Sequence, residues 1–331
     1  EGDLLLQFED DDDDESKEEE EEKADPRPTK HTRLCHPRPD YGASVWGVML
    51  ETMRSLHQAR QLHPACVIAE GFRRRFRVPY EFFLLLVEVV KPWFGNVTRD
   101  VAKRDCVPVT LKVLGVLHVL GRGSNSFADI QQMSLMSRQT AEKAFRDFCE
   151  HFPANLYDAW VHLPTGEDLV EVENKFRERG YPGAVGSTSC MRVARGRCPP
   201  ADARTHTGKE GFPSWKYGVT VDLDGRILAS TKGNPGGLSE KAVVRGDVSV
   251  LRVRDESPWA TLKFFLCEDD GREVEHVGGW LVASGECDRW NVLLSPIKPP
   301  SDENELRWSE RLEDIREDAE RLLAKLRGRF R

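Results

Sequence analysis

The hydrophobic periodicity of the chain changes near Pro164, and this change limits the fold more than any other feature of the sequence. Before it, apolar residues recur at helical spacing from about residue 45 onward. One further helix is predicted over residues 165–180, after which the pattern alternates as in strands and a two-residue Asp224-Gly225 turn separates two such segments. A chain with a helical first part and a second part that mixes strands with helices is predicted to belong to the α/β class.

Short strands and a closing helix make up the predicted second part. The strands are expected at residues 185–193, 217–223, 226–231, 251–253, 262–267 and 279–283. Residues 303–327 are predicted to form an amphipathic helix, because apolar residues recur there at steps of three or four: Trp308, Leu312, Ile315, Ala319, Leu322 and Leu326. We expect a mixed sheet with an antiparallel hairpin over residues 217–231 and the closing helix packed on it.

The first part contains several predicted helices. They are expected over residues 45–62, after Pro79 and over residues 108–120, where His118 is interpreted as a core histidine rather than a ligand. A short helix over 128–133, a turn and a second helix capped by Ser137 have the pattern of a helix-turn-helix.

The second helix of this pair suggests contact with DNA. Arg138, Gln139 and Lys143 are expected near its exposed N-terminal half, where a recognition helix presents side chains to the major groove. The same pattern also occurs in proteins that bind no DNA, so both interpretations stay open.

Charge is distributed very unevenly along the chain. Residues 1–23 hold 14 acidic and 2 basic residues, a net charge of −12, so the rest carries +4 of the overall −8. Such a like-charge block is expected to be disordered, followed by a Pro-containing linker. The predicted organisation is therefore a tail and linker over residues 1–43, a helical region over 44–165 and an α/β core over 166–331. A mildly basic body behind an acidic tail is compatible with nucleic-acid binding.

The apolar runs and the cysteine spacing give little further information on fold or function. No apolar run reaches about 20 residues, so we expect no membrane span, and the start at Glu1 predicts no signal peptide. The eight cysteines form no C-x-x-C pair and are expected to be reduced. Cys190, Cys198 and His206 are conceivable zinc ligands, but small buried side chains are the preferred interpretation of these cysteines. The absence of an initial Met suggests a fragment or a processed start.

Six blocks in the second part follow one another in an order typical of a known family. They are GSTS (186–189), GKEGFP (208–213), VTVD (219–222), PGGLSEK (235–241), GGWLVAS (278–284) and DAERLLAKL (318–326). In this order they resemble the Harbinger superfamily of DNA transposases, the branch described as plant transposon proteins. The resemblance covers about residues 70–331 and is strongest over 180–247 and 278–331. The chain stops where relatives usually continue, so a core truncated at its C-terminus is expected.

The resemblance implies a ribonuclease-H-like core in which three carboxylates bind Mg²⁺ or Mn²⁺ and DNA is cut. The positions of those carboxylates correspond here to Ser189, Ser284 and Glu320, so only the third is an acid. A serine hydroxyl is neutral and offers one weak oxygen ligand. We therefore expect a degenerate copy with impaired catalysis and, at most, weak metal binding at Glu320.

Other acids near these positions are candidates to replace the lost carboxylates. Glu240 stands where the family's PG-x-x-x-D-K loop has an aspartate, and Glu286 and Asp288 follow Ser284 closely. Asp222 is expected beside the hairpin turn and away from the site.

The segment between the first predicted strand and the hairpin is rich in cations. It is interpreted either as a phosphate-binding surface or as an ordinary solvated loop, and it contains Arg192, Arg195, Arg197, Arg204 and Lys209. Trp215 and Tyr217 are expected to serve packing rather than base stacking.

Three functions are compatible with the sequence: an active metal-dependent nuclease, a DNA-binding protein without cleavage, and a decayed element without function. The resemblance implies DNA as a partner, a separate Myb-like DNA-binding partner protein and a nuclear location.

Overall fold

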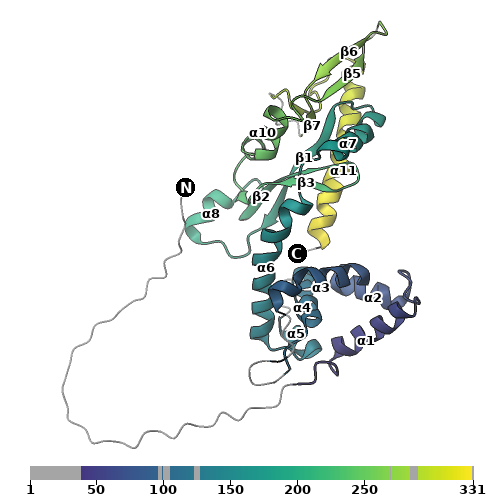
Figure 1. The fold of residues 1–331 in the computed structure, drawn as a ribbon. Coiled ribbons are helices and arrows are strands. Elements are labelled where there is room, and N and C mark those ends of the chain that lie inside the picture. The colour runs from purple at the N-terminus through teal and green to yellow at the C-terminus, as the bar shows by residue number, and fades with distance from the viewer. Residues whose placement is uncertain are drawn as a thin grey trace, which may run out of the picture. The chain divides into compact units, whose positions relative to one another are not determined.

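The structure, a computed structural model, describes residues 39–95, 99, 105–122, 127–268, 270–283 and 290–329. These residues form eleven helices and eight strands, and the predicted α/β class is confirmed (Figure 1). No described helix combines the length and the apolar character that crossing a membrane requires. Ser284, Glu286 and Asp288 lie outside the described residues.

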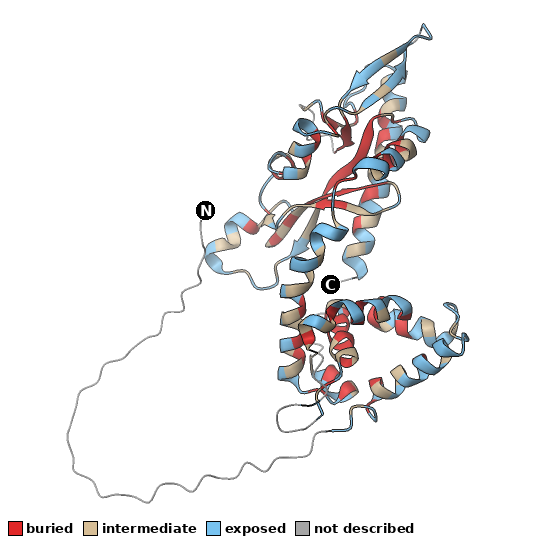
Figure 2. Ribbon diagram, viewed as in Figure 1, coloured by how far each residue is buried: buried red, intermediate tan, exposed pale blue. Residues whose placement is uncertain are grey.

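The helical part has one hydrophobic core. Its helices are α1 (Val45–Gln58), α2 (Val67–Phe76), α3 (Tyr80–Phe94), α4 (Val109–Arg122), α5 (Phe127–Ser134) and α6 (Arg138–Trp160). The buried hydrophobic residues of these helices form a single cluster, and the ribbon is red where residues are buried in Figure 2. The sequence pattern does not predict helix α2, because its arginine-rich second half hides the apolar pair Phe72 and Phe76, which are both buried. His118 is buried in this core, as expected.

The predicted turn between α5 and α6 and the predicted N-terminal cap of α6 are confirmed. Three residues, Leu135 to Ser137, join α5 to α6, and the Ser137 side chain accepts a hydrogen bond from the Thr140 amide. Ile130 and Ala141 are buried between the helices and the rest of the core.

The second part is built on a mixed sheet. Its helices are α7 (Gly166–Glu178), α8 (Pro200–His206), α9 (Glu240–Arg245), α10 (Val248–Asp255) and α11 (Glu303–Arg329). Its strands are β1 (Ala184–Ala194), β2 (Ser214–Val221), β3 (Ile227–Ser230), β4 (Asn234–Pro235), β5 (Lys263–Cys267), β6 (Glu273–Val277), β7 (Trp280–Val282) and β8 (Leu293–Leu294).

Strand β1 is the centre of this sheet. The order is β3-β2-β1-β7-β8, with β4 also paired to β2, and β5 and β6 form a separate hairpin. Strand β1 pairs antiparallel with β2 and parallel with β7, and β2 pairs antiparallel with β3 across the predicted turn. The mixed sheet and the antiparallel hairpin are therefore confirmed.

Helices cover both faces of the sheet. Helices α7 and α11 pack on one face of the sheet (Figure 1). Helices α9 and α10 pack on the other. The fully buried stripe of α11 is Leu312, Ile315, Ala319 and Leu323, so the closing helix packs on the sheet as predicted. Leu322 is partly buried against the same cluster, and the prediction missed Leu323.

The predicted strand over residues 251–253 is wrong, because these residues belong to helix α10. The Asp247 carboxylate caps this helix by accepting a hydrogen bond from the Ser249 amide at 2.8 Å. Val250 and Val253, three residues apart, are both fully buried. β-branched residues favour strands, but here a cap and a helical burial pattern outweigh that preference.

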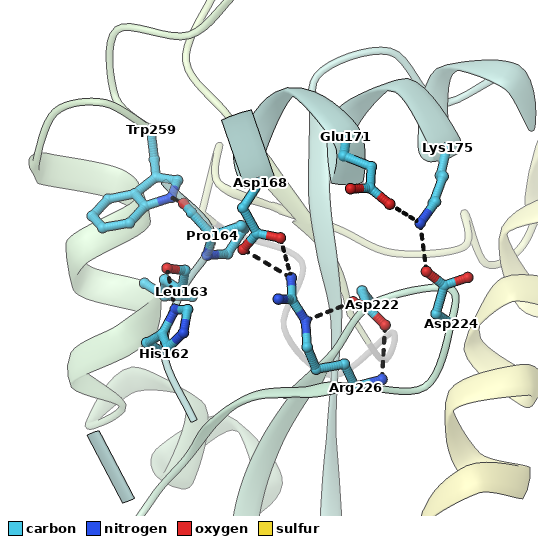
Figure 3. A network of polar contacts seen from close by, with 10 residues as sticks. All are labelled: His162, Leu163, Pro164, Asp168, Glu171, Lys175, Asp222, Asp224, Arg226 and Trp259. Atoms are coloured by element: carbon cyan, nitrogen blue, oxygen red, sulfur yellow. Dashed lines mark hydrogen bonds and ion pairs between the residues drawn. The ribbon is translucent and has the colours of Figure 1, made fainter. Parts of the chain in front are cut away.

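Helix α7 is tied to the β2–β3 turn by ion pairs (Figure 3). The Arg226 guanidinium donates to both carboxylate oxygens of Asp168, at 2.9 and 3.0 Å, and to Asp222 at 3.1 Å. Lys175 bridges Glu171 and Asp224, each at 2.6 Å, and these two carboxylates raise its pKa. Asp222 therefore belongs to the turn, as expected.

Candidate functional site

Ser189 is the central residue of β1, within a polar run at the centre of the sheet. Ser187, Thr188 and Ser189 are all buried, and the Ser187 and Thr188 hydroxyls have no hydrogen-bond partner among the described residues. Ser187 and Ser189 alternate with Thr188 and point to the face that α11 covers, because each of the two serines lines a cavity together with α11 residues.

Ser189 and Glu320 line the same cavity. Its volume is about 490 Å³, and its walls come from β1, from the GKEGFP segment and from the C-terminal half of α11. The structure thus brings together two of the three positions to which the family resemblance assigns carboxylates. These assignments remain predictions, but the two side chains share one space.

The third position, Ser284, follows Ala283, the last described residue after β7. Strand β7 runs parallel to β1, with Ser187 paired to Val282. The C-terminal end of β7 therefore lies beside β1 at Ser187, two residues before Ser189, while Ser284 itself is outside the described residues.

The donors that line the cavity do not fit a two-metal site. Glu320 is ion-paired with Arg316, which also holds Glu313 at 2.6 Å, and Ser189 contributes a neutral hydroxyl. Among the described residues, no group of three or more His, Cys, Asp or Glu side chains is arranged to hold a metal ion. Two divalent ions need several hard anionic oxygens to offset their charge, and the described side chains do not supply them.

Arg192 joins two of the sequence blocks beside this cavity. Its guanidinium pairs with Glu210 of the GKEGFP segment and with Glu240 of the PGGLSEK loop, the latter at 3.2 Å. Only 25% of the Arg192 side chain is exposed. Glu240 is therefore engaged by a cation and does not line the cavity with Ser189. Glu210 does line the cavity, and sequence reasoning misses it as a site residue although the GKEG block that contains it is recognisable.

Backbone contacts hold the PGGLSEK loop to β2 and to α8, the two elements on either side of the GKEGFP block. The Gly236 amide donates to the Ser214 carbonyl at 2.9 Å, and the Gly237 amide donates to the Thr205 carbonyl at 3.0 Å. A Cβ added at Gly236 would lie 2.5 Å from the His206 carbonyl oxygen and 2.7 Å from that of Ser214. Only glycine allows the loop to approach β2 this closely.

Lys216 adds a side-chain link between β2 and the PGGLSEK loop. Its ammonium is buried and donates to the Leu238 carbonyl. Burial, and after it the neighbouring Arg192, lowers the pKa of Lys216. These blocks, which are separate in the chain, therefore form one packed junction.

The predicted cationic surface is only partly available to a ligand. Arg192 is held as described, and Arg195 pairs with Asp202 at 3.1 Å and lies over the Trp215 ring at 4.8 Å. Arg197, Arg204 and Lys209 are exposed. Trp215 thus packs against Arg195, which agrees with the packing interpretation.

His206 is engaged by protein groups on both ring nitrogens. Nδ1 lies 3.0 Å from the Asp202 carbonyl oxygen and Nε2 lies 3.1 Å from the Arg195 guanidinium. Cys198 donates to the Pro199 carbonyl at 3.6 Å. These contacts leave no convergent set of donors on Cys190, Cys198 and His206.

The predicted DNA-contacting residues of α6 are all exposed. Arg138, Gln139 and Lys143 lie in the first turns of the helix. Arg138 pairs with Glu142 at 2.7 Å, and 69% of its side chain is exposed. An exposed pair of this kind is weak and can exchange for a phosphate contact.

A family model described as plant transposon protein matches residues 158–331, more than half of the chain. The match covers β1, β2, β7 and α11 with the cavity between them, whereas the helical part lies before it. Comparisons with curated proteins and with solved structures give no match.

Proposed function

Because the chain belongs to the plant transposon protein family, we propose that this transposase-derived protein, of Harbinger type with a ribonuclease-H-like core, binds DNA without cleaving it. The observation that carries the proposal is the cavity shared by Ser189 and Glu320. The resemblance assigns the first and third carboxylates to these two positions, and one of them is a serine.

The chemistry of the cavity supports the loss of cleavage. When bound in such an enzyme, two divalent ions activate the attacking oxygen and stabilise the leaving one. Here the described residues offer Glu320, which is paired with Arg316, and Glu210, which is paired with Arg192. Each of these carboxylates is thus already ion-paired with an arginine.

Nicking of supercoiled plasmid tests the cleavage part. The unaltered chain is expected to show no Mg²⁺- or Mn²⁺-dependent nicking, and Ser189→Asp with Ser284→Asp together is expected to restore metal binding, measured by calorimetry. Either replacement alone should do much less. Metal-dependent nicking by the unaltered chain that disappears in Glu320→Gln would refute the loss of cleavage. Nicking that persists in Glu320→Gln would instead refute the assignment of Glu320.

The exposed start of α6 supports the binding part, with α5 and α6 acting as a helix-turn-helix. Each phosphate contact contributes about −0.9 to the slope of log K against log salt concentration. The double change Arg138→Gln and Lys143→Gln is therefore expected to reduce the slope for duplex DNA by about 2. Arg307→Gln is a matched control, because Arg307 is 67% exposed and paired with Glu303 in the same i, i+4 manner. An equal effect of the control would refute a specific role for α6.

The proposal also covers the acidic segment over residues 1–23, the cellular location and a partner protein. Deleting residues 1–23 removes a charge of −12 and should tighten duplex binding, most clearly at low salt. We propose a nuclear location and a Myb-like partner protein, which immunofluorescence and co-purification from nuclear extract would test. A chain with neither binding nor cleavage would support a decayed element.

A further inference from the structure

The hairpin of β5 and β6 projects beyond the end of the main sheet (Figure 1). Among the described residues, each of its two strands pairs with the other and with no further strand. A two-stranded hairpin is marginally stable in water, and a strand with one unpaired side is a template for another strand. The hairpin therefore presents a free edge on each side.

The backbone groups at the free edge of β5 belong to every second residue. The Gly278 amide donates to the Leu262 carbonyl at 2.8 Å, which sets the alternation of hydrogen bonds along the antiparallel pair. Residues 264 and 266 then bond to β6, and the amides and carbonyls between them point outward. The outward residues are Lys263, Phe265 and Cys267.

Apolar side chains of β5 are exposed on both faces of the hairpin. Phe265 is 55% and Leu266 is 39% exposed, and successive side chains of a strand point to opposite faces. Cys267 is exposed as well. Most of the hairpin has the pale blue of exposed residues in Figure 2. An exposed apolar edge of this kind favours pairing with another chain.

The free edge of β6 is protected by charge. Its outward residues are Glu273, Glu275 and Val277, the cross-strand partners of the outward residues of β5. Two copies paired about Glu275 would place two carboxylates directly opposite each other, which is unfavourable. Strand β5 carries no acidic residue, so its edge lacks this protection.

We propose that β5 pairs antiparallel with β5 of a second copy of this chain, giving one continuous sheet of order β6-β5-β5-β6. The two-fold axis passes beside Phe265, which faces Phe265 of the second copy. Lys263 then faces Cys267 of the second copy. This register uses every outward residue of β5, and opposed aromatic side chains stabilise a strand pair.

The same register is complementary on the other face of the hairpin. Within one copy, Phe264 stacks on His276 with ring centroids 5.5 Å apart, and Leu266 is paired with Val274. Across the two-fold axis, Phe264 faces Leu266 of the second copy. Strand β5 thus complements itself on both faces, which favours a second copy over an unrelated strand.

Sedimentation velocity of the full chain tests the pairing, at micromolar concentration and at physiological salt, which screens the acidic segment. We expect a concentration-dependent dimer. Phe265→Lys should weaken it at least about tenfold, because two like charges then lie directly opposite each other. Val277→Lys is the matched control, since Val277 is 61% exposed at the free edge of β6, and its replacement should leave the dimer intact. Both positions are exposed, so the circular dichroism spectrum should not change.

Disulfide cross-linking tests the register. Lys263→Cys should form a disulfide with the natural Cys267 of the second copy, because opposed residues of a hydrogen-bonded pair lie about 5.5 Å apart at Cα. Within one chain these two positions are about 13 Å apart along the strand, too far for a disulfide. Val277→Cys is the control, since it would lie two strand spacings, about 10 Å, from Cys267 of the second copy. Mild oxidation and a non-reducing gel should give a linked dimer for Lys263→Cys alone.

An unaltered chain that sediments as a monomer would overturn the proposal. So would a dimer that Phe265→Lys weakens no more than Val277→Lys does. Equal cross-linking of Lys263→Cys and Val277→Cys would overturn the register. None of these measurements uses DNA or a metal ion, so their outcome is independent of the proposed binding without cleavage.

Discussion

Replacing Gly236 by alanine tests the junction between the GKEGFP and PGGLSEK blocks. The added Cβ would collide with the Ser214 hydroxyl oxygen, which can rotate away, but it would also lie 2.5 and 2.7 Å from the carbonyl oxygens of His206 and Ser214, which cannot. The loop must therefore move away from β2. Overpacking of this kind costs about 1–3 kcal/mol, and weakening the two amide–carbonyl bonds at Gly236 and Gly237 adds about 1 kcal/mol each.

We therefore expect Gly236→Ala to lower the free energy of unfolding by about 3–5 kcal/mol. In urea this corresponds to a midpoint lower by about 1.5–2.5 M, for an m-value of about 2 kcal/mol/M. Tryptophan fluorescence is a suitable probe, because Trp215 lies next to the junction. Gly196→Ala is the control: a Cβ added there meets no atom within 4 Å and its φ is not positive, so its effect should stay within about 0.5 kcal/mol. Equal midpoints for the two variants would refute the packed junction.

Three further changes test other parts of the second half. Arg192→Met removes the cation between Glu210 and Glu240 and should cost about 1–3 kcal/mol in urea unfolding, because two partly buried carboxylates lose their partner. Asp247→Asn keeps the helix cap but removes the carboxyl group, whose pKa is raised by burial. Because ionisation of Asp247 destabilises the fold as pH rises, the variant should be more stable than the parent at pH 7–8, and the two should be equally stable in acid. Trp259→Phe removes a buried hydrogen bond of 2.8 Å to a backbone carbonyl and should cost about 2–4 kcal/mol by thermal and urea unfolding.

The matched controls for these changes are exposed residues of the same type. Arg197→Met and Trp160→Phe should each change stability by less than about 0.5 kcal/mol. For Asp247→Asn the control is the pH series itself. A stability difference from the parent that stays constant between about pH 3 and pH 8 would contradict the assigned cost of burial.

Elements with strong local signals are predictable from the sequence. The hairpin around Asp224-Gly225 and the stripe through Leu312, Ile315 and Ala319 each depend on residues close in the chain, and the structure confirms both elements. The turn itself is longer than the predicted two residues, because the Gly225 amide donates to the Asp222 carbonyl and β3 begins only at Ile227. Helix α10 is mistaken for a strand when its valines are given more weight than the capping Asp247.

The surroundings of the candidate site are less predictable. The sequence presents Arg192 as a possible phosphate ligand, yet Glu210 and Glu240, which reach it from two separate loops, neutralise it. Such a contact depends on how the loops fold over the sheet, and no local pattern records it. Ser189 and Glu320 are paired only through the family resemblance, because no periodicity in the sequence joins them.

The central position of β1 has a consequence for how the chain folds during synthesis. Its partner β2 follows after the short helix α8, whereas its other partner, β7, begins only at Trp280. A ribosome therefore releases the three-stranded meander of β1, β2 and β3 long before β7 and α11 exist. Until then one side of β1 lacks its backbone partner, and Val219 and Val221 of β2 lack the α11 side chains that cover them. Pairing of this long range slows folding and leaves strands open to association with other chains. Nascent chains stalled before β7 should accordingly depend on chaperones more than complete ones.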